Sequence, residues 1–198
     1  MKLYVLVIVI AASILALINA FFMPWWLSPA LVTYSVIGCI ALHGAGAGII
    51  YSMRRFIKPT SWYFKVSKRE TRFWEFFGVR KFKDLLPDLG GKFVGFEKAR
   101  LANPKDTEYI KKYIHETCVG EIGHILGGIL GFAVLLLLPM HYYWLIIALP
   151  CAVVNLFLAI LPIITMRYNR YKLLSLLKIV EIQNLREERK KTEEEVSG

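Results

Sequence analysis

The sequence predicts an all-α fold, an integral membrane four-helix bundle with a cytoplasmic, interfacial amphipathic insertion between its second and third helices. Two long blocks, residues 3–53 and 122–166, contain no Asp, Glu, Lys or Arg. A membrane crossing needs roughly 20 consecutive apolar residues, so each block is long enough for a helical hairpin. All 25 basic residues lie outside these blocks. This separation of charge from apolar sequence is typical of a membrane domain and is not needed in a soluble core.

Each uncharged block divides at a turn. Prolines and neighbouring aromatic residues mark both turns, because proline interrupts a helix and Trp and Tyr favour the headgroup level. The predicted helices are 3–22, 30–52, 113–138 and 144–166, with turns at 23–29 and 139–143 and kinks at Pro150 and Pro162. A polar helix over 173–196 follows, and we expect the last ten residues to be disordered or solvated. The chain thus divides into an N-terminal hairpin (1–53), an interfacial segment (54–112), a C-terminal hairpin (113–172) and a tail (173–198).

A hairpin returns the chain to the side from which it entered, so all the basic segments share one side. The positive-inside rule assigns that side to the cytoplasm, which predicts a multi-pass plasma-membrane protein with both termini cytoplasmic. A cleaved signal peptide at the start is the alternative, but Ile18 fits poorly at the small-residue position of a cleavage site. The net charge of +10 suits a surface that faces anionic headgroups, and we expect no nucleic-acid partner.

The insertion between the hairpins is too polar to cross a membrane and too aromatic for a plain linker. Basic and aromatic residues alternate through it, which predicts an amphipathic segment over 72–86 that lies in the interface and ends at 87–91. A soluble mini-domain is the alternative, but few aliphatic residues are available for a core. No pair of cysteines has metal-site or redox spacing, so we expect small buried hydrophobes at Cys39, Cys118 and Cys151.

The third predicted helix carries one stripe of polar and small residues at steps of three and four. Its members are Thr117, Gly120, Glu121, His124, Gly127, Gly128 and Gly131. Small residues allow another helix or a lipid chain to approach the backbone closely. An ionisable residue so near the hydrocarbon indicates a functional site by default.

Glu121 and His124 are three residues apart and share a helix face. The carboxylate could orient the imidazole so that the imidazole removes a proton from a substrate hydroxyl. Alternatively, the two residues could bind a metal, with further ligands from His43, Glu116 or His115. A third interpretation is a polar pair that only fixes the third helix to its neighbours.

Other polar residues have both structural and functional interpretations. His43 and Asn155 are expected first as interhelical hydrogen-bonding contacts. The run Arg167-Tyr168-Asn169-Arg170 could anchor in headgroups or clamp a phosphate, which arginine forks suit. The cluster Arg80-Lys81-Phe82-Lys83 is a second candidate of this kind.

Three blocks of the sequence resemble the glycosyl-diaponeurosporenoate acyltransferase family of staphyloxanthin-type carotenoid synthesis. The resemblance spans roughly residues 73–173, although Phe82 stands where the family often has tryptophan. The blocks are Phe73-Trp74 to Asp88, including Val79-Arg80-Lys81-Phe82-Lys83 and Leu86-Pro87-Asp88; Glu116-Thr117-x-x-Gly120-Glu121-x-x-His124; and Asn155 with Pro162 leading to Arg167-Tyr168-Asn169-Arg170.

The resemblance implies acyl transfer from an acyl thioester to a hydroxyl of a membrane-bound glycolipid or isoprenoid glycoside. His124 would be the base, oriented by Glu121, with no metal and no resident cofactor, and acyl-CoA would be a co-substrate. The expected substrate-binding residues are Glu116, Thr117, Asn155, Arg80, Lys81, Arg167, Asn169 and Arg170. The acceptor's apolar chain would lie along the glycines of the second and third helices. The alternative is a non-enzymatic lipid-binding or membrane assembly protein whose polar stripe serves helix packing.

Overall fold

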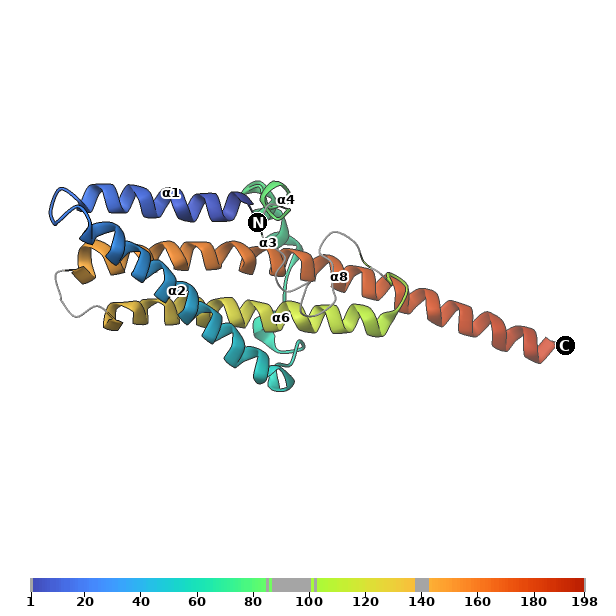
Figure 1. The fold of residues 1–198 in the computed structure, drawn as a ribbon. Coiled ribbons are helices and arrows are strands. Elements are labelled where there is room, and N and C mark those ends of the chain that lie inside the picture. The colour runs from blue at the N-terminus through green and yellow to red at the C-terminus, as the bar shows by residue number, and fades with distance from the viewer. Residues whose placement is uncertain (1, 85, 87–100, 102, 138–142, 198) are drawn as a thin grey trace.

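The computed structural model describes residues 2–84, 86, 101, 103–137 and 143–197, and this part of the chain is helical with no strand. Long helices lie side by side and the last extends beyond the bundle (Figure 1). The elements are α1 (Lys2–Asn19), α2 (Leu27–Ser52), η1 (Arg54–Phe56), η2 (Trp62–Phe64), α3 (Lys68–Phe76), α4 (Val79–Phe82), α6 (Thr107–Leu130), η3 (Gly131–Leu137), η4 (Trp144–Ala148) and α8 (Leu149–Ser197). The predicted all-α class is therefore confirmed.

Among the described residues, three helical stretches are long and apolar enough to cross a membrane, namely Leu27–Ser52, Thr107–Leu137 and Leu145–Glu195. The apolar part of α1, Val5–Asn19, is shorter than a full crossing. The predicted bundle of four crossing helices thus has three members by this measure, with α1 as a shorter apolar helix. α1 nevertheless joins the bundle, because Ser28 donates to the carbonyl of Ala16 (2.6 Å) and Asn19 to that of Ile146 (3.1 Å).

Helix boundaries differ from the prediction at the charged end of the bundle. α6 begins at Thr107 rather than at residue 113, because the Asp106 side chain caps it by accepting from two backbone N–H groups. The fourth predicted helix and the tail helix form one helix, α8, which keeps Pro162 inside it and runs to Ser197. The predicted domain boundaries at 112/113 and 172/173 therefore fall inside helices.

An apolar cluster explains why α8 continues past its basic residues. Ile110 and Ile114 of α6 pack with Leu173 and Val180 of α8, and all four are buried. The apolar face of α8 therefore persists after the chain has become polar. Beyond this cluster Glu181 is half-buried and the side chains of residues 182–195 are exposed, so this part of the chain is solvated, as expected, and it is helical.

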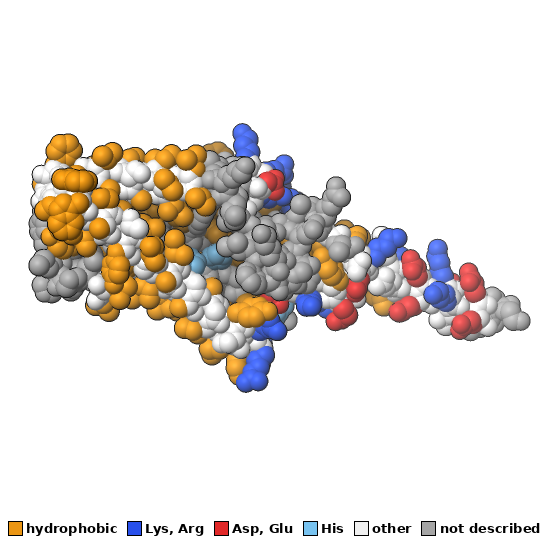
Figure 2. Space-filling view, viewed as in Figure 1, with side chains coloured by type: hydrophobic (Ala, Val, Ile, Leu, Met, Phe, Trp, Pro, Cys, Tyr) orange, Lys and Arg blue, Asp and Glu red, His pale blue; other side chains and the backbone are white. Residues whose placement is uncertain are grey.

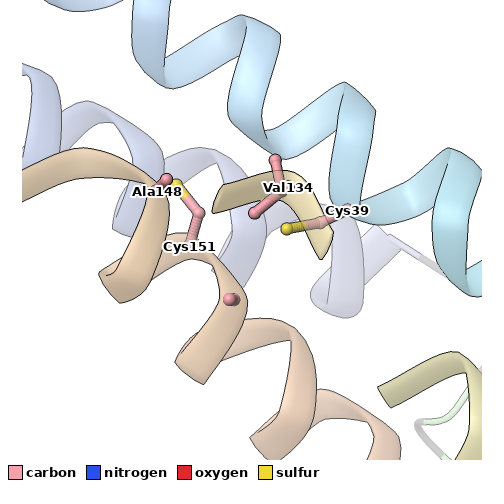
Figure 3. Packing of buried hydrophobic residues seen from close by; sticks show 5 residues of the cluster. Cys39, Val134, Ala148 and Cys151 are labelled. Atoms are coloured by element: carbon pink, nitrogen blue, oxygen red, sulfur yellow. The ribbon is translucent and has the colours of Figure 1, made fainter. Parts of the chain in front are cut away.

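A second apolar cluster packs between helices of the bundle (Figure 3). It joins α2, η3, η4 and α8 through Cys39, Val134, Ala148, Cys151 and Ala152. All three cysteines of the chain are buried and free, which confirms their prediction as small buried hydrophobes. The second predicted turn, residues 139–143, lies almost entirely outside the described residues.

The described part of the predicted amphipathic segment, 72–86, falls on two short helices, α3 and α4. Ser67 caps α3 by accepting from the backbone N–H of Glu70. Gly78 separates α3 from α4 with a φ of 79°, a left-handed conformation that costs glycine least. The predicted end of the segment, 87–91, lies outside the described residues.

Charged and apolar side chains occupy different ends of the visible face (Figure 2). Apolar side chains cover the bundle, whereas Lys, Arg, Asp and Glu gather around α3, α4 and the protruding end of α8. The start of α1 lies at this charged end, and the turn between α1 and α2 lies at the other (Figure 1). The structure thus combines an apolar helical body with one charged end.

Candidate functional site

Three side chains from three helices form a continuous hydrogen-bonded chain inside the apolar body. His43 of α2 contacts His124 of α6 through Nε2 and Nδ1, 3.1 Å apart. The other ring nitrogen of His43, Nδ1, lies 3.1 Å from Oδ1 of Asn155 on α8. The two imidazole rings meet edge to face, with centroids 5.3 Å apart. All three side chains are half-buried.

Glycines of α6 and η3 provide the space for these three side chains. A Cβ at Gly127 would lie 2.7 Å from the ring of His43, and one at Gly131 would collide with the amide of Asn155. A Cβ at Gly46 of α2 would lie 2.9 Å from the backbone of Gly127. The sequence predicted that a helix or a lipid chain would approach the glycine stripe closely. At these positions the approaching groups belong to other helices, and they fill the space that a lipid chain would need.

One helical turn from His124 along α6, Glu121 is fully buried and ion-paired. Arg170 donates to Glu121 Oε2 at 2.6 Å, and it also donates to the hydroxyl (3.0 Å) and carbonyl (2.9 Å) of Thr117 and to the carbonyl of Phe64 (3.4 Å). Arg170 is only 1% exposed. Burial of a charge is costly without a partner, and this geometry gives both charges partners.

Arg167 connects Glu121 to the insertion. It donates to Glu121 Oε1 at 2.9 Å and to both carboxylate oxygens of Glu70 on α3, at 2.5 and 3.1 Å. Its remaining contacts are the carbonyls of Tyr63 (3.3 Å) and Lys65 (3.2 Å). Two carboxylates and two guanidinium groups thus form a neutral network that fixes α3 and η2 against α6 and α8.

The network changes the pKa of its members outside the apolar helices. Burial raises the pKa of Glu70, but the hydrogen bonds and charge of Arg167 outweigh burial, so the net pKa is below its ordinary value. Burial, followed by the charge of Glu121 and a hydrogen bond to it, raises the pKa of the Tyr63 hydroxyl. Both shifts favour an ionised Glu70 and a neutral Tyr63 beside the arginines.

The structure gives both residues that the sequence paired further partners on other helices. Both carboxylate oxygens of Glu121 accept from arginines of α8, and His124 is hydrogen-bonded to His43 of α2. Orientation of His124 by Glu121 stays a prediction.

The other predicted substrate-binding residues divide between the network and the surface. Thr117 belongs to the network, and Asn155 belongs to the histidine chain. Glu116 and Asn169 are half-buried beside them, and Lys81 and Arg80 are exposed on α4. Arg80 pairs with Glu75 at 2.7 Å, and Glu75 also accepts from Tyr168 at 3.1 Å. Phosphate binding by Arg167 and Arg170 stays a prediction, and it would require exchange of the partners just described.

The metal interpretation needs further ligands beside Glu121 and His124, from His43, Glu116 or His115. In the part of the chain that the structure describes, no group of three His, Cys, Asp or Glu side chains is arranged to hold a metal ion. His115 contacts the backbone carbonyl of Arg54 at 3.1 Å, and its other ring nitrogen lies 3.9 Å from Glu116.

Sequence reasoning missed two parts of the site. It treated His43 as a packing residue or metal ligand rather than as the partner of His124, and it did not consider Glu70. The signal for His43 was present, because a histidine in an uncharged helix next to Gly44 and Gly46 needs a polar partner. Glu70 carried no such signal, since it lies on a short charged helix far away in the sequence.

An apolar helical body with a half-buried histidine chain and a neutralised charge network defines a membrane protein with a polar site between its helices. The family model for CrtO, glycosyl-4,4'-diaponeurosporenoate acyltransferase, matches residues 59–179. The chain belongs to this family, and the match includes α3, α4, α6 and most of the apolar part of α8. No curated protein and no solved structure matches the chain.

Proposed function

We propose that this protein transfers an acyl group from an acyl thioester to a hydroxyl of a membrane-bound glycolipid or isoprenoid glycoside, with His124 as the general base. The observation that carries the proposal is the hydrogen-bonded pair of His43 and His124 inside an apolar body. Polar, ionisable side chains are costly at such a position, so their presence favours a chemical role. The family provides the reaction class, because its printed description is an acyltransferase.

The chemistry needs one proton to move twice. A hydroxyl is a weak nucleophile, so a base must take its proton as the oxygen attacks the thioester carbonyl. A C–O bond forms, the tetrahedral intermediate collapses with cleavage of the C–S bond, and the protonated His124 returns the proton to the leaving thiolate. The products are the ester and the free thiol, and no other reactant is required.

The negative charge on the carbonyl oxygen of the intermediate requires hydrogen-bond donors. Asn155 is our candidate, because its Nδ2 is buried and has no hydrogen-bond partner among the described residues. Arg167 is a second candidate, because its side chain remains 18% exposed. Glu121 then holds the two arginines in place.

The charged end of the molecule suits a soluble acyl donor. Arg80 and Lys81 are exposed there, and they would contact the phosphates of acyl-CoA. The exposed aromatic side chains Phe73, Phe76 and Phe77 on and next to α3 would lie among anionic headgroups of the cytoplasmic leaflet. The apolar acceptor would enter from the bilayer, so donor and acceptor would meet at the interface.

A non-enzymatic role in lipid binding or membrane assembly is the second candidate. It is favoured by the close packing of the glycine stripe, since α2 contacts the backbone of Gly127 directly. In that case the histidine chain would only stabilise the helix contacts, and the protein would have no turnover to lose.

Acyl transfer can be measured with the purified protein in lipid nanodiscs, palmitoyl-CoA and glycosyl-4,4'-diaponeurosporenoate. We expect His124→Ala to lower the rate by about 100-fold or more, because general-base catalysis contributes roughly 10²–10⁴-fold. His115→Ala is the matched control, because His115 lies on the same helix but does not belong to the hydrogen-bonded chain. This variant should keep its activity. Full activity of His124→Ala would refute the proposal, and a wild-type protein that binds the acceptor without transfer would favour the second candidate.

A further inference from the structure

The hydrogen bonds between Asn155, His43 and His124 have a direction that assigns the protons of both rings. Asn155 turns its Oδ1 toward His43 Nδ1. A carbonyl oxygen only accepts, so Nδ1 of His43 carries the hydrogen. A neutral imidazole carries a single ring hydrogen, and therefore Nε2 of His43 is an acceptor.

The same reasoning extends one ring further. His43 Nε2 lies 3.1 Å from His124 Nδ1, so Nδ1 of His124 must donate. In a neutral His124 the other nitrogen, Nε2, then has a lone pair and no hydrogen. The two hydrogen bonds thus determine which nitrogen of His124 can accept a proton.

We infer that His43 is a positioning residue for His124, held in turn by Asn155, and that Nε2 of His124 is the basic atom. This inference rests on the proposed function. When His124 Nε2 takes the substrate proton, Nδ1–H keeps its hydrogen bond to the lone pair of His43 Nε2, which stabilises the imidazolium. His43 therefore has the role that a carboxylate has in many catalytic triads, and it adds no negative charge to the membrane interior.

Packing against glycines limits the movement of His43 and Asn155. A Cβ at Gly127 would overlap the ring of His43, and a Cβ at Gly131 would overlap the amide of Asn155. Neither side chain therefore has space to move away toward α6 or η3. Both are held in place by packing as well as by hydrogen bonds.

Two variants of His43 separate positioning from packing. His43→Leu removes the acceptor, and we expect it to lower kcat by about 10- to 100-fold while the KM for the acceptor stays within about twofold. His43→Gln retains an oxygen that can accept from Nδ1–H of His124, and we expect it to recover most of the rate. Equal loss in both variants, or no loss in either, would overturn the inference.

¹⁵N NMR of histidine-labelled protein in nanodiscs tests the proton assignment without any turnover. We expect both His43 and His124 as the Nδ1–H tautomer, with His124→Ala and His43→Leu used to assign the signals. A wild-type His124 in the Nε2–H form would overturn the inference, because the amide of Asn155 would then face the opposite way. Activity of His124→Ala would refute the proposed function, whereas an inactive His124→Ala with a fully active His43→Leu would refute positioning alone.

Discussion

At the scale of single residues, glycine on α6 determines whether the histidine chain can form. Gly127 and Gly123 lie one turn apart and both face α2, but their surroundings differ. A Cβ at Gly127 would be 2.8 Å from the backbone carbonyl of His43, whereas one at Gly123 would be 3.6 Å from Ala47. Backbone cannot move aside as a flexible side chain can. Of these two positions, therefore, Gly127 requires glycine for steric reasons and Gly123 does not.

Gly127→Ala should therefore be harmful and Gly123→Ala tolerated. We expect Gly127→Ala to cost about 1–3 kcal/mol of stability through overpacking and to reduce acyl transfer, since α2 must shift away with His43. Gly123→Ala should be neutral or stabilising by up to about 1 kcal/mol, because alanine favours the helix. Thermal unfolding in detergent measures both variants, and equal effects would show that α2 does not approach α6 as described.

Glu121 forms ion pairs that the spacing along α6 did not predict. It is fully buried and pairs with Arg167 and Arg170. Removing one partner of a buried ion pair lowers the stability of the folded protein far more than replacing both partners with apolar residues.

Glu121→Gln should accordingly destabilise the protein by about 3–5 kcal/mol, because it leaves the buried Arg170 without a counter-charge. Glu75→Gln is the control at the more exposed pair with Arg80, and its effect should be much smaller. Denaturant unfolding monitored by tryptophan fluorescence compares the two. A stable Glu121→Gln protein with lost activity would instead support the original hypothesis that Glu121 orients His124.

At the scale of elements, α3 is attached to the membrane helices by a titratable contact. Both oxygens of Glu70 accept from Arg167 of α8, and the indole N–H of Trp74 lies 3.3 Å from Oε1. Since the pKa of folded Glu70 lies below its ordinary value of 4.5, its contribution to stability is complete above that value. It is lost as the pH falls through the lower, folded pKa.

We expect α3 to detach on acidification before the apolar helices open. Hydrogen exchange of the α3 backbone should therefore rise as the pH falls from 4.5 through the lower pKa of folded Glu70, after correction for intrinsic exchange. Glu70→Gln should show raised exchange already at neutral pH and little further change on acidification. Identical pH dependence in the wild type and in Glu70→Gln would contradict this role of Glu70.

The helices themselves were predicted with different success. The uncharged blocks predicted α1, α2 and the apolar parts of α6 and α8, since the cost of burying charge in a bilayer excludes Lys, Arg, Asp and Glu from such stretches. The start of α6 and the continuity of α8 were missed. The start of α6 depends on the cap by Asp106. The continuity of α8 depends on contacts of Leu173 and Val180 with Ile110 and Ile114, which are distant in sequence and fall inside polar surroundings.

At the scale of the whole molecule, the charged end gives the protein a polarity along its long axis (Figure 2). α3, α4 and the protruding part of α8 lie at that end, whereas Trp25 and Trp26 are exposed at the opposite turn. From the positive-inside rule, we propose that this charged end faces the cytoplasm.

Cysteine labelling in intact cells tests this orientation. The three natural cysteines are buried, so they should contribute little background. We expect Trp25→Cys to react with a membrane-impermeant maleimide in intact cells, and Glu187→Cys to react only after permeabilisation. The opposite pattern would invert the topology and would place the acyl-donor surface outside the cell.

The sequence by itself determined the class of the protein, its apolar helices, its segregated charge and its family. These properties are local or compositional, because the bilayer acts on each stretch of chain separately. Only the tertiary structure decided the partners of Glu121 and His124. Spacing on one helix brings two side chains to the same face, but hydrogen bonds are taken by the groups that other helices present there. α8 presents two arginines to Glu121 and α2 presents His43 to His124, and no pattern within α6 contains that information.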